Sequence, residues 1–511
     1  MNESDYARLA ASCDRWLRAP GTDDARLAIG FLHLVHEHPS WLAQYRRLFE
    51  PDAIPMRDRP LVRGARDLFR MTRGLGRAIR PHTPRAAPET SARPLDVLVV
   101  SRLHNDSQLT LRDDFYFGDL PRRLRERGLR VLVALVDHRL DPGSREPETD
   151  SARFLLPRSL TPRAEMALWK HCAAARVRLW HDSESARDEL DRATARVAAE
   201  LALAAGTAAN LRLQIAVRDL CSRLRPRMVL TTFEGDASER MIFLATRQSG
   251  AAPLCVGYQH TRLLPRAHAV RRALENPALP ADPDVVLALG AETQALLESV
   301  PRAARCILYG SHRRVAAKSS LTTAPRSSMC LVLPDAEPGE YALMLEFTVA
   351  CAKHAADVQF VFRPHPASTT ARRRAQGLIS RDWPPNLRID GEDSLERQAA
   401  SARSCLYRAS SAALQATLFG ARPLFLARPG ELHFDPLGAM PGSCTVMTPA
   451  DVAHQARGAG WENSPLATAA WQYCDRYFPP VRGAALDELL SLVYGARRSR
   501  SDASGFHDAQ R

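Results

Sequence analysis

The sequence predicts an α/β fold with two mostly parallel sheets and a helical N-terminal region. Two series of short apolar, β-branched segments support this prediction, and helix-like segments separate the members of each series. Strands that alternate with helices are typical of β-α-β units, whose helices return the chain to a parallel neighbour. We expect two such halves, with a ligand outside the C-terminal ends of their strands, in the crevice between them.

Apolar runs that are separated by turn residues predict the individual helices and strands. In residues 1–50, apolar side chains return at helical intervals, which predicts helices there. The first series predicts strands at 95–101, 129–136, 228–233, 253–258, 284–289 and 306–309, with helical segments at 115–127, 164–225 and 237–248. The second series predicts strands at 327–334, 358–363, 404–407 and 423–426, with helices near 338–355, 393–402 and 410–420.

Changes in composition set the expected domain boundaries. Four prolines between residues 81 and 94 predict a linker, so the helical extension and its basic linker cover 1–93. The two strand series then define an N-terminal half at 94–310 and a C-terminal half at 311–495. The polar text that follows predicts a disordered tail at 496–511.

The overall composition is that of an ordinary globular protein. The 511 residues are 45% hydrophobic and 25% charged, which excludes a wholly disordered chain, a collagen and a coiled-coil rod. No run approaches the roughly 18 consecutive apolar residues that span a bilayer. The N-terminus has no apolar signal-peptide segment, so a cytoplasmic protein is expected. The ten scattered cysteines form no CxxC pair, which favours buried free thiols over disulfides or a zinc site.

Much of the net charge of +13 lies in one segment. Only three of the 70 basic residues are lysines, which indicates a coding bias toward arginine, yet eight arginines and two acids lie within 61–93. Across 61–80 the arginines return every three or four residues opposite an apolar face, the pattern of a basic amphipathic helix. Contact with an anionic inner membrane surface and a solvated face packed on the main body are both open interpretations. Phe69 is the one aromatic residue among these arginines, which argues against nucleic-acid binding.

Polar residues follow two strands of the second series. In Arg363-Pro364-His365-Pro366, two prolines restrict the backbone around an imidazole that can meet a phosphate oxygen. Ser410 and Ser411 begin the helix at 410–420, where exposed N–H groups and hydroxyls form an anion site that needs no metal. A polar loop and an ordinary helix cap explain the same residues structurally. The sequence has no GxxxxGK[ST], GxGxxG or GxSxG motif that would indicate another nucleotide or hydrolase site.

Acidic residues follow a strand of the first series. Glu234 comes directly after the strand at 228–233, and Asp236, Glu239 and Arg240 are close by. Carboxylates crowded at a strand end can raise one another's pKa and act as a base or a nucleophile, although helix-capping acids fit the same pattern.

Gln259 and His260 follow the next strand, at 253–258, and we expect them beside the acidic group in a parallel sheet. His260 is suited to position a substrate hydroxyl or a phosphate; a hydrogen-bonded loop histidine is the structural alternative. A second group of histidines, at 33, 36 and 38, lacks the HExxH spacing and has no cysteine nearby, so no metal site is predicted.

In order and spacing, these groups resemble the bacterial surface-carbohydrate glycosyltransferases of the GT-B fold. This group includes the Kdo transferases of capsule and lipopolysaccharide assembly and the HP-motif sialyltransferases. Those families have an acidic motif in the N-terminal half, and an HP motif followed by a Ser-Ser motif in the C-terminal half. Glu234, His365 and Ser410 match that order, with 131 residues from the first to the second and 45 from the second to the third. The segment at 113–121 also looks like that of O-antigen biosynthesis proteins of this type.

The resemblance implies a GT-B-like fold of two Rossmann-like domains facing a cleft. It also implies transfer of a sugar from a nucleotide-sugar, with a CMP-sugar such as CMP-Kdo favoured, to a lipid-linked or growing surface polysaccharide. No cofactor and no metal are implied, since the nucleotide-sugar is a co-substrate. The implied roles are catalytic for Glu234, Asp236 and His365, nucleotide-binding for Arg363, His365, Pro366, Ser410, Ser411 and Gln415, and acceptor contact or support for Glu239, Arg240, Gln259 and His260.

Gln415 departs from the family pattern. Many GT-B enzymes have a Glu at this place that contacts the nucleotide ribose, and Gln hydrogen-bonds without charge assistance. Two alternatives stay open. One is transfer of a polyol phosphate from a CDP-activated donor, since such enzymes also have HP and Ser-Ser features, and the other is a catalytically silent GT-B scaffold in polysaccharide assembly.

Overall fold

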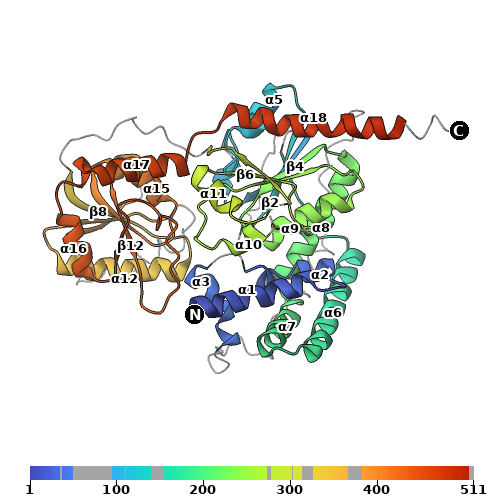
Figure 1. The fold of residues 1–511 in the computed structure, drawn as a ribbon, viewed down its shortest axis with the longest axis horizontal. Coiled ribbons are helices and arrows are strands. Elements are labelled where there is room, and N and C mark those ends of the chain that lie inside the picture. The colour runs from blue at the N-terminus through green and yellow to red at the C-terminus, as the bar shows by residue number, and fades with distance from the viewer. Residues whose placement is uncertain are drawn as a thin grey trace.

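The computed structural model contains two parallel sheets that lie side by side, with helices packed around each (Figure 1). It describes residues 1–34, 37–49, 95–109, 111–139, 153–272, 275, 278–301, 303–312, 326–365, 383–390 and 392–505. The predicted fold class is confirmed, because both sheets have the parallel, helix-connected strand order of a Rossmann-like domain. The basic segment at 61–80, His36 and Pro366 lie outside the described residues.

The first sheet has seven parallel strands in the order β3-β2-β1-β4-β5-β6-β7. They are β1 (Val97–Leu103), β2 (Val131–Asp137), β3 (Arg153–Leu155), β4 (Met228–Thr232), β5 (Leu254–Tyr258), β6 (Val285–Ala288) and β7 (Arg305–Leu308). Val97 and Val99 pack in one core and Leu98 and Val100 in another, so β1 is buried on both faces. Because β2 and β4 flank β1, the winding of the chain reverses at β1, and the C-terminal ends of β1 and β4 form the switch point where ligands bind in such sheets.

The second sheet has six parallel strands in the order β10-β9-β8-β11-β12-β13. They are β8 (Ser327–Leu333), β9 (Gln359–Phe362), β10 (Leu387–Ile389), β11 (Ala402–Tyr407), β12 (Arg422–Leu426) and β13 (Cys444–Val446). The winding reverses between β8 and β11, so the switch point of this sheet lies at their C-terminal ends. The three-residue strands β3, β10 and β13 are edge strands that the sequence pattern did not predict.

Helices connect the strands of both sheets. Those of the first half are α5 (Leu120–Glu126), α6 (Pro162–Ser185), α7 (Glu189–Leu201), α8 (Ala205–Leu224), α9 (Ala237–Gln248), α10 (His268–Arg272) and α11 (Ala291–Glu298). Those of the second are α12 (Pro338–His354), α14 (Leu395–Ser401), α15 (Ala412–Leu418), α16 (Pro449–Arg457) and α17 (Pro465–Tyr477). The helix predicted at 115–127 begins later, because the Asp114 carboxylate accepts hydrogen bonds from the N–H groups of Tyr116 and Phe117 and holds this segment as a turn.

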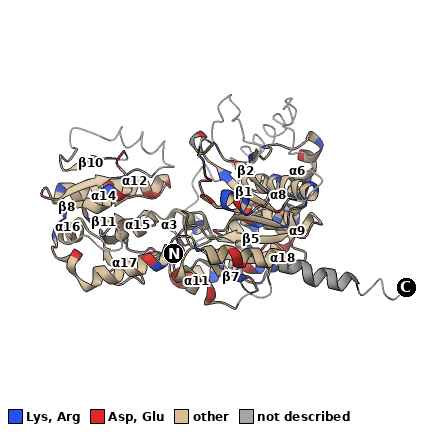
Figure 2. Cartoon of the chain, turned by 90° about the horizontal axis from the view of Figure 1, so that it is seen from above, with Lys and Arg blue, Asp and Glu red and all other residues tan. Residues whose placement is uncertain are grey.

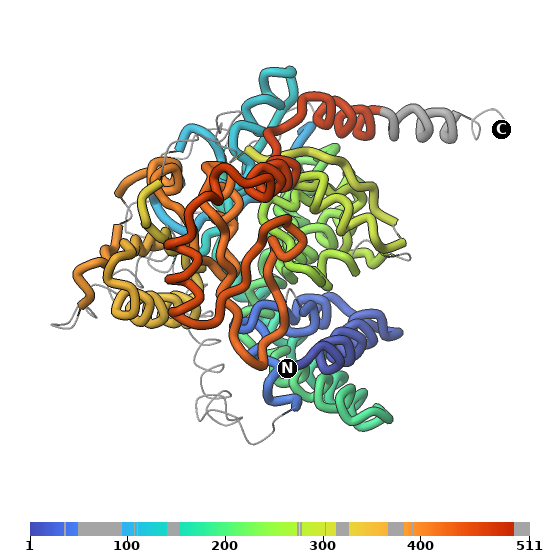
Figure 3. The backbone as a smooth tube through the Cα atoms, turned by 60° about the vertical axis from the view of Figure 1, so that its left-hand side comes forward, coloured from blue at the N-terminus to red at the C-terminus, as the bar shows by residue number. Residues whose placement is uncertain are grey.

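The N-terminal helices are part of the first half. They are α1 (Glu3–Arg18), α2 (Asp24–Leu27), η1 (Gly30–His33), α3 (Pro39–Leu42) and η2 (Ala43–Leu48). Their apolar side chains share one core with α6, α7 and α8. Figures 1 and 3 both show this blue segment beside the teal and green helices α6 and α7. In the described part of the chain, no helix has the length and apolarity to cross a membrane.

The last helix, α18 (Gly483–Gly505), returns to the first half. Ala485, Leu486 and Leu489 are buried in the core of the first sheet. The predicted boundary at residue 495 falls inside α18, which runs from Gly483 to Gly505 and packs on the first sheet. Elsewhere, Figure 2 shows acidic and basic residues interspersed over both halves.

Candidate functional site

The loop after β4 lies at the switch point of the first sheet and is organised around the buried Glu239. One oxygen of this carboxylate accepts the backbone N–H groups of Glu234, Gly235 and Asp236 at 2.8, 2.9 and 3.0 Å. The other accepts the Thr232 hydroxyl at 2.9 Å and the Arg102 guanidinium at 3.1 Å. Burial raises the pKa of Glu239, but all five contacts are with donors, so the ionised carboxylate is the form that fits the network.

Arg102, at the C-terminal end of β1, joins the two strands of the switch point. It also contacts the Asp236 carboxylate at 3.0 Å and the Ser238 hydroxyl at 3.3 Å. Burial alone would lower the pKa of Arg102, but the carboxylates of Asp236, Glu239 and Glu234 outweigh burial and raise it. Arg102 therefore holds Asp236 in place, and its positive charge offsets the negative charge of the acidic loop.

The side chains of Glu234 and His260 meet at the ends of β4 and β5. The Glu234 carboxylate is 32% exposed and lies 3.2 Å from His260 Nε2, which is itself buried. Tyr116 packs edge-on against the imidazole, with ring centroids 5.0 Å apart. Gln259, also buried, accepts the N–H of Leu289 at 3.0 Å and fixes the start of the His260 loop. Of the predicted acids, Glu234 alone combines exposure with a histidine partner rather than a guanidinium.

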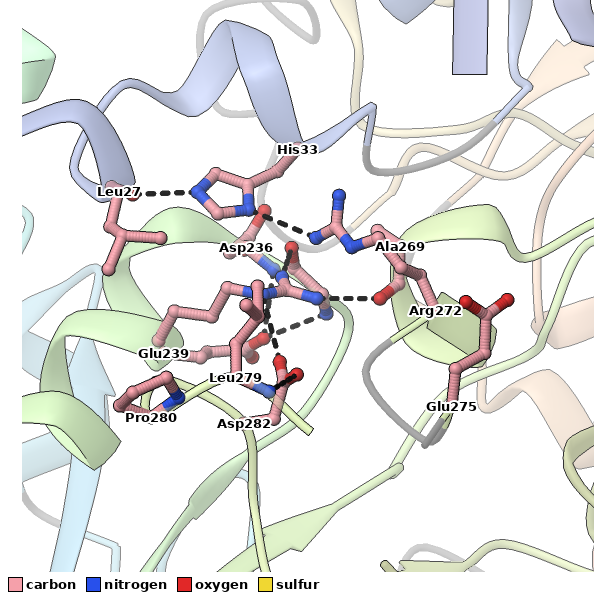
Figure 4. A network of polar contacts seen from close by, with 12 residues as sticks. Leu27, His33, Asp236, Glu239, Ala269, Arg272, Glu275, Leu279, Pro280 and Asp282 are labelled. Atoms are coloured by element: carbon pink, nitrogen blue, oxygen red, sulfur yellow. Dashed lines mark hydrogen bonds and ion pairs between the residues drawn. The ribbon is translucent and has the colours of Figure 1, made fainter. Parts of the chain in front are cut away.

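Arg240 supports the acidic loop through hydrogen bonds to backbone carbonyl oxygens. This fully buried side chain donates to the carbonyl oxygens of Gly235 and Ala269, and its Nε lies 3.5 Å from Asp282. Figure 4 labels two of these partners, Ala269 and Asp282. Burial lowers its pKa to about 10. Arg240 is thus a support for the loop and does not reach a ligand.

His33 connects the N-terminal helices to this support. Its Nε2 donates to the Leu27 carbonyl oxygen at 2.6 Å, and its Nδ1 accepts from Arg272 at 3.2 Å (Figure 4). Because an arginine nitrogen only donates, Nδ1 carries no proton and the imidazole is neutral. Burial and the charges of Arg240 and Arg272 hold the pKa of His33 well below 6.5.

We expect acid to destabilise the protein through His33. In the unfolded chain this histidine binds a proton below about pH 6.5, whereas in the folded chain it does not, so stability falls as pH decreases. The expected contribution is about 1.4 kcal/mol per pH unit below 6.5. Chemical unfolding from pH 7 to pH 5 measures it: His33→Gln should flatten the dependence, and His354→Gln, at an exposed position of α12, should leave it unchanged. An equal slope in all three proteins contradicts the assignment.

The HP segment follows β9, at the same edge of the second sheet as the switch point. Arg363 is half-buried and donates to the Asp393 carbonyl oxygen at 2.6 Å and to Gln398 at 2.8 Å. It is thus bound within its own half. Burial would raise the pKa of Asp335, which follows β8, but the charges of Arg262, His38 and His365 outweigh burial and lower it.

The two predicted serines follow β11. Ser411 occupies the N-cap position of α15 but its side chain makes no capping hydrogen bond. Within the described residues, neither it nor the buried Ser410 makes a side-chain hydrogen bond, so the expected hydroxyl cap is not formed. Gln415 lies on the following turn. Both hydroxyls can form hydrogen bonds to a ligand. The helix dipole contributes little to anion binding, because α15 has only seven residues.

Arg408, which no sequence motif indicates, lies between β11 and the serines. It is almost fully buried and donates to Glu340 at 2.6 Å, to Glu431 at 2.8 Å and to the Leu426 carbonyl oxygen at 3.0 Å. It therefore holds together three segments at the switch point of the second sheet.

An ion pair joins the edges of the two sheets. Arg262, in the loop after β5, forms an ion pair with Asp335 after β8 at 3.3 Å. Arg262 and Glu234 both line a small cavity of about 40 Å³. Glu234 thus lies near the Arg262 end of this pair, and His365 follows β9, the neighbour of the strand that precedes Asp335.

Residues 37 and 38 of the N-terminal region also lie at this junction. The Glu37 carboxylate accepts the backbone N–H of Arg266 at 2.5 Å, and His38 lies 3.9 Å from Glu340. His38 also packs edge-on against Phe434, with centroids 4.9 Å apart. Among the described residues, no group of three or more His, Cys, Asp and Glu side chains is arranged to hold a metal ion.

Comparisons with known proteins find similarity only among solved structures. No protein-family model and no curated protein matches the chain. An α,α-trehalose 6-phosphate synthase from Burkholderia multivorans is 11% identical and is matched over 82% of this chain and 99% of that one, with a TM-score of 0.43. MurG from Acinetobacter baumannii is 11% identical, with coverages of 78% and 99% and a TM-score of 0.42. The UDP-GlcNAc 2-epimerase of Methanocaldococcus jannaschii is 8% identical, with coverages of 78% and 99% and a TM-score of 0.41. Function must therefore be inferred from the residues of the site.

Proposed function

We propose that the protein is a metal-independent glycosyltransferase that moves a sugar from a nucleotide-sugar to a glycan acceptor. The observation that supports this most is the exposed Glu234 carboxylate, 3.2 Å from His260 at the switch point of one sheet. The Arg262–Asp335 ion pair connects its surroundings to the HP segment of the other half. A base on one side and phosphate-binding groups on the other are the two requirements of sugar transfer.

In the proposed reaction, Glu234 accepts the proton of the acceptor hydroxyl. The acceptor oxygen forms a bond to the anomeric carbon as the bond from that carbon to the phosphate oxygen breaks. The phosphate leaves with the bonding electrons, and His365 and the hydroxyls of Ser410 and Ser411 stabilise the charge that grows on it. Groups placed in advance around that charge stabilise the transition state more than the ground state. His260 positions the Glu234 carboxylate.

The remaining assignments complete the proposal. Asp236, fixed by Arg102, is the second candidate for the base, and Glu239, Arg240 and Gln259 support the loops. Arg363, Pro366 and Gln415 are proposed to shape the nucleotide site, with CMP as the favoured nucleotide and a CMP-sugar such as CMP-Kdo as donor. A lipid-linked or surface polysaccharide as acceptor, and contact of 61–80 with the inner membrane, belong to the same proposal.

Calorimetric titration with CMP, UDP and GDP tests the nucleotide assignment. We expect CMP to bind most tightly, and His365→Ala and a Ser410→Ala/Ser411→Ala double variant each to weaken binding at least tenfold, about 1.4 kcal/mol. Glu234→Gln should bind CMP as the unchanged protein does, because Glu234 lies on the other side of the junction. Absence of binding of all three nucleotides contradicts the proposal, as does an equal loss of affinity in Glu234→Gln.

A further inference from the structure

A cavity of about 660 Å³ lies beside the C-terminal ends of β2 and β3. Its lining includes residues 136–139 at the end of β2, residues 156–159 after β3, and side chains of α6 and α8. Ligands of parallel sheets bind outside the carboxyl ends of the strands, and small-molecule sites have volumes of about 300–1,000 Å³. Since Glu234 does not line this cavity, it is a candidate site in addition to the junction.

Arginines supply the hydrogen bonds of both carboxylates that line the cavity. Asp137 lies 2.8 Å from Arg139 and 2.7 Å from Arg158. Glu165 is fully buried, and its two oxygens accept from two nitrogens of Arg212 at 2.7 and 2.8 Å. The carboxylates are therefore already satisfied, and the cavity has little need of a ligand that donates hydrogen bonds to them.

Two of these arginines retain N–H groups for a ligand. Arg212 contacts Glu165 through Nε and Nη2, and its Nη1 has no hydrogen-bond partner among the described residues. Arg158 contacts Asp137 and the Arg139 carbonyl oxygen through Nη2 alone, which leaves its Nε and Nη1 without an acceptor in the described part of the chain. The side chains of Arg212 and Arg158 are 17% and 30% exposed, so both are open to a ligand that enters the cavity.

Other lining side chains fit a phosphate that is attached to a sugar. His138, after β2, and Ser159, after β3, make no side-chain hydrogen bond within the described residues, and each can donate one. Donors on different elements suit the tetrahedral oxygens of a phosphate, and guanidinium groups bind phosphate well. Asn210, on α8, donates to the Ala28 carbonyl oxygen at 2.9 Å, and its Oδ1 is suited to accept from a sugar hydroxyl.

A series of neighbouring rings connects the cavity to the proposed base. His138 stacks on His104, with ring centroids 5.3 Å apart, and His104 lies 6.1 Å from Tyr116. Tyr116 in turn packs against His260, the histidine that lies 3.2 Å from Glu234. These rings follow β1, β2 and β5, so the cavity and the proposed base lie along the same C-terminal edge of the first sheet.

We infer that this cavity binds a phosphorylated sugar, with the phosphate on the free N–H groups of Arg158 and Arg212 and a ring hydroxyl on Asn210. The inference rests on the proposed function, because it names the chemical class of the acceptor from which Glu234 takes a proton. A lipid-linked sugar and a phosphorylated glycan end both provide this chemistry.

Calorimetric titration with sugar phosphates tests the inference without any donor. The probes are the 1-phosphates and 6-phosphates of glucose, mannose and N-acetylglucosamine, the three parent sugars, and glucuronic acid as a carboxylate. We expect at least one phosphate to bind at least tenfold more tightly than both its parent sugar and glucuronic acid. Tighter binding of a 1-phosphate supports a lipid-linked acceptor, and tighter binding of a 6-phosphate supports a phosphorylated glycan. A smaller difference from either reference overturns the inference.

Substitutions of the two arginines locate the binding. Arg158→Gln should weaken binding of the sugar phosphate at least tenfold, because Arg139 still pairs with Asp137 while the free N–H groups are lost. Arg176→Gln, at an exposed position of α6 that does not line the cavity, is the control and should bind as the unchanged protein does. Arg212→Lys keeps a positive charge beside Glu165 but removes the free Nη1, so it should also weaken binding. If Arg158→Gln and Arg212→Lys both bind normally, the cavity is not the site.

Titration with CMP on the same samples separates this inference from the proposed function. Arg158→Gln should bind CMP as the unchanged protein does, because the nucleotide is assigned to the second half. If Arg158→Gln weakens CMP binding as much as sugar-phosphate binding, the cavity holds the nucleotide and the inference is overturned. If the sugar phosphate binds in the cavity but CMP, UDP and GDP do not bind, the sugar-phosphate site stands and the proposed function fails.

Discussion

Glu239→Ala is expected to lower the free energy of unfolding by about 3–5 kcal/mol, the cost typical of removing one partner from a buried charge network. The substitution leaves five donors without their acceptor: three backbone N–H groups, the Thr232 hydroxyl and the Arg102 guanidinium. Among the described carboxylates, Asp236 is then the one that remains within ion-pair distance of Arg102. Urea unfolding followed by circular dichroism measures the change.

An exposed carboxylate of the same half provides the control. Glu184 lies on α6 of the same half and is exposed, so Glu184→Ala should change the free energy of unfolding by less than about 0.5 kcal/mol. The change in the free energy of unfolding for Glu239→Gln should lie between those of the two alanine variants. The amide retains one acceptor oxygen, but its N–H₂ group faces groups that are themselves donors. A loss below 1 kcal/mol for Glu239→Ala contradicts the view that this residue organises the loop.

The sequence allowed the position of the acidic loop to be predicted, but not how it is held. The strand before Glu234 could be predicted because β4 consists of apolar and β-branched residues, and polar residues follow it. Arg102 was not selected, since it lies in β1, which the pattern predicts as a buried strand up to residue 101. The signal that could have found it is an arginine near the end of the first strand, where the switch point of a parallel sheet is expected.

Contacts between distant segments account for the rest of what the sequence did not predict. Arg408 contacts Glu340 and Glu431, which precede and follow it by 68 and 23 residues, and no local periodicity links such residues. The N-terminal helices were predicted as helices, but their place in the core with α6 and α7 depends on tertiary packing. Likewise, α18 follows the second half in the sequence, but its apolar side chains are buried in the core of the first half.

Glu234→Gln is expected to reduce sugar transfer by a factor of about 10² to 10⁴, the usual contribution of a general base. The amide has nearly the shape of the carboxylate but cannot accept the proton of the acceptor hydroxyl. Because Glu234 is 32% exposed and its side chain contacts His260 rather than the loop network, the thermal unfolding midpoint should not change. Nucleotide release from a CMP-sugar, in the presence of acceptor glycan, measures the rate.

Asp236→Asn distinguishes the two candidate bases. Asp236 is the N-cap residue of α9 and an ion-pair partner of Arg102, so its substitution should lower the unfolding midpoint while the transfer rate falls less than tenfold. The reverse pattern, an active Glu234→Gln and a stable but inactive Asp236→Asn, would assign the proton transfer to Asp236. His260→Gln refines the choice: if the imidazole acts by positioning Glu234, its loss should lower the rate constant and leave CMP affinity unchanged. If neither acid affects the rate, no carboxylate of this loop takes part in the reaction, and the protein is then better described as a scaffold that retains a transferase fold.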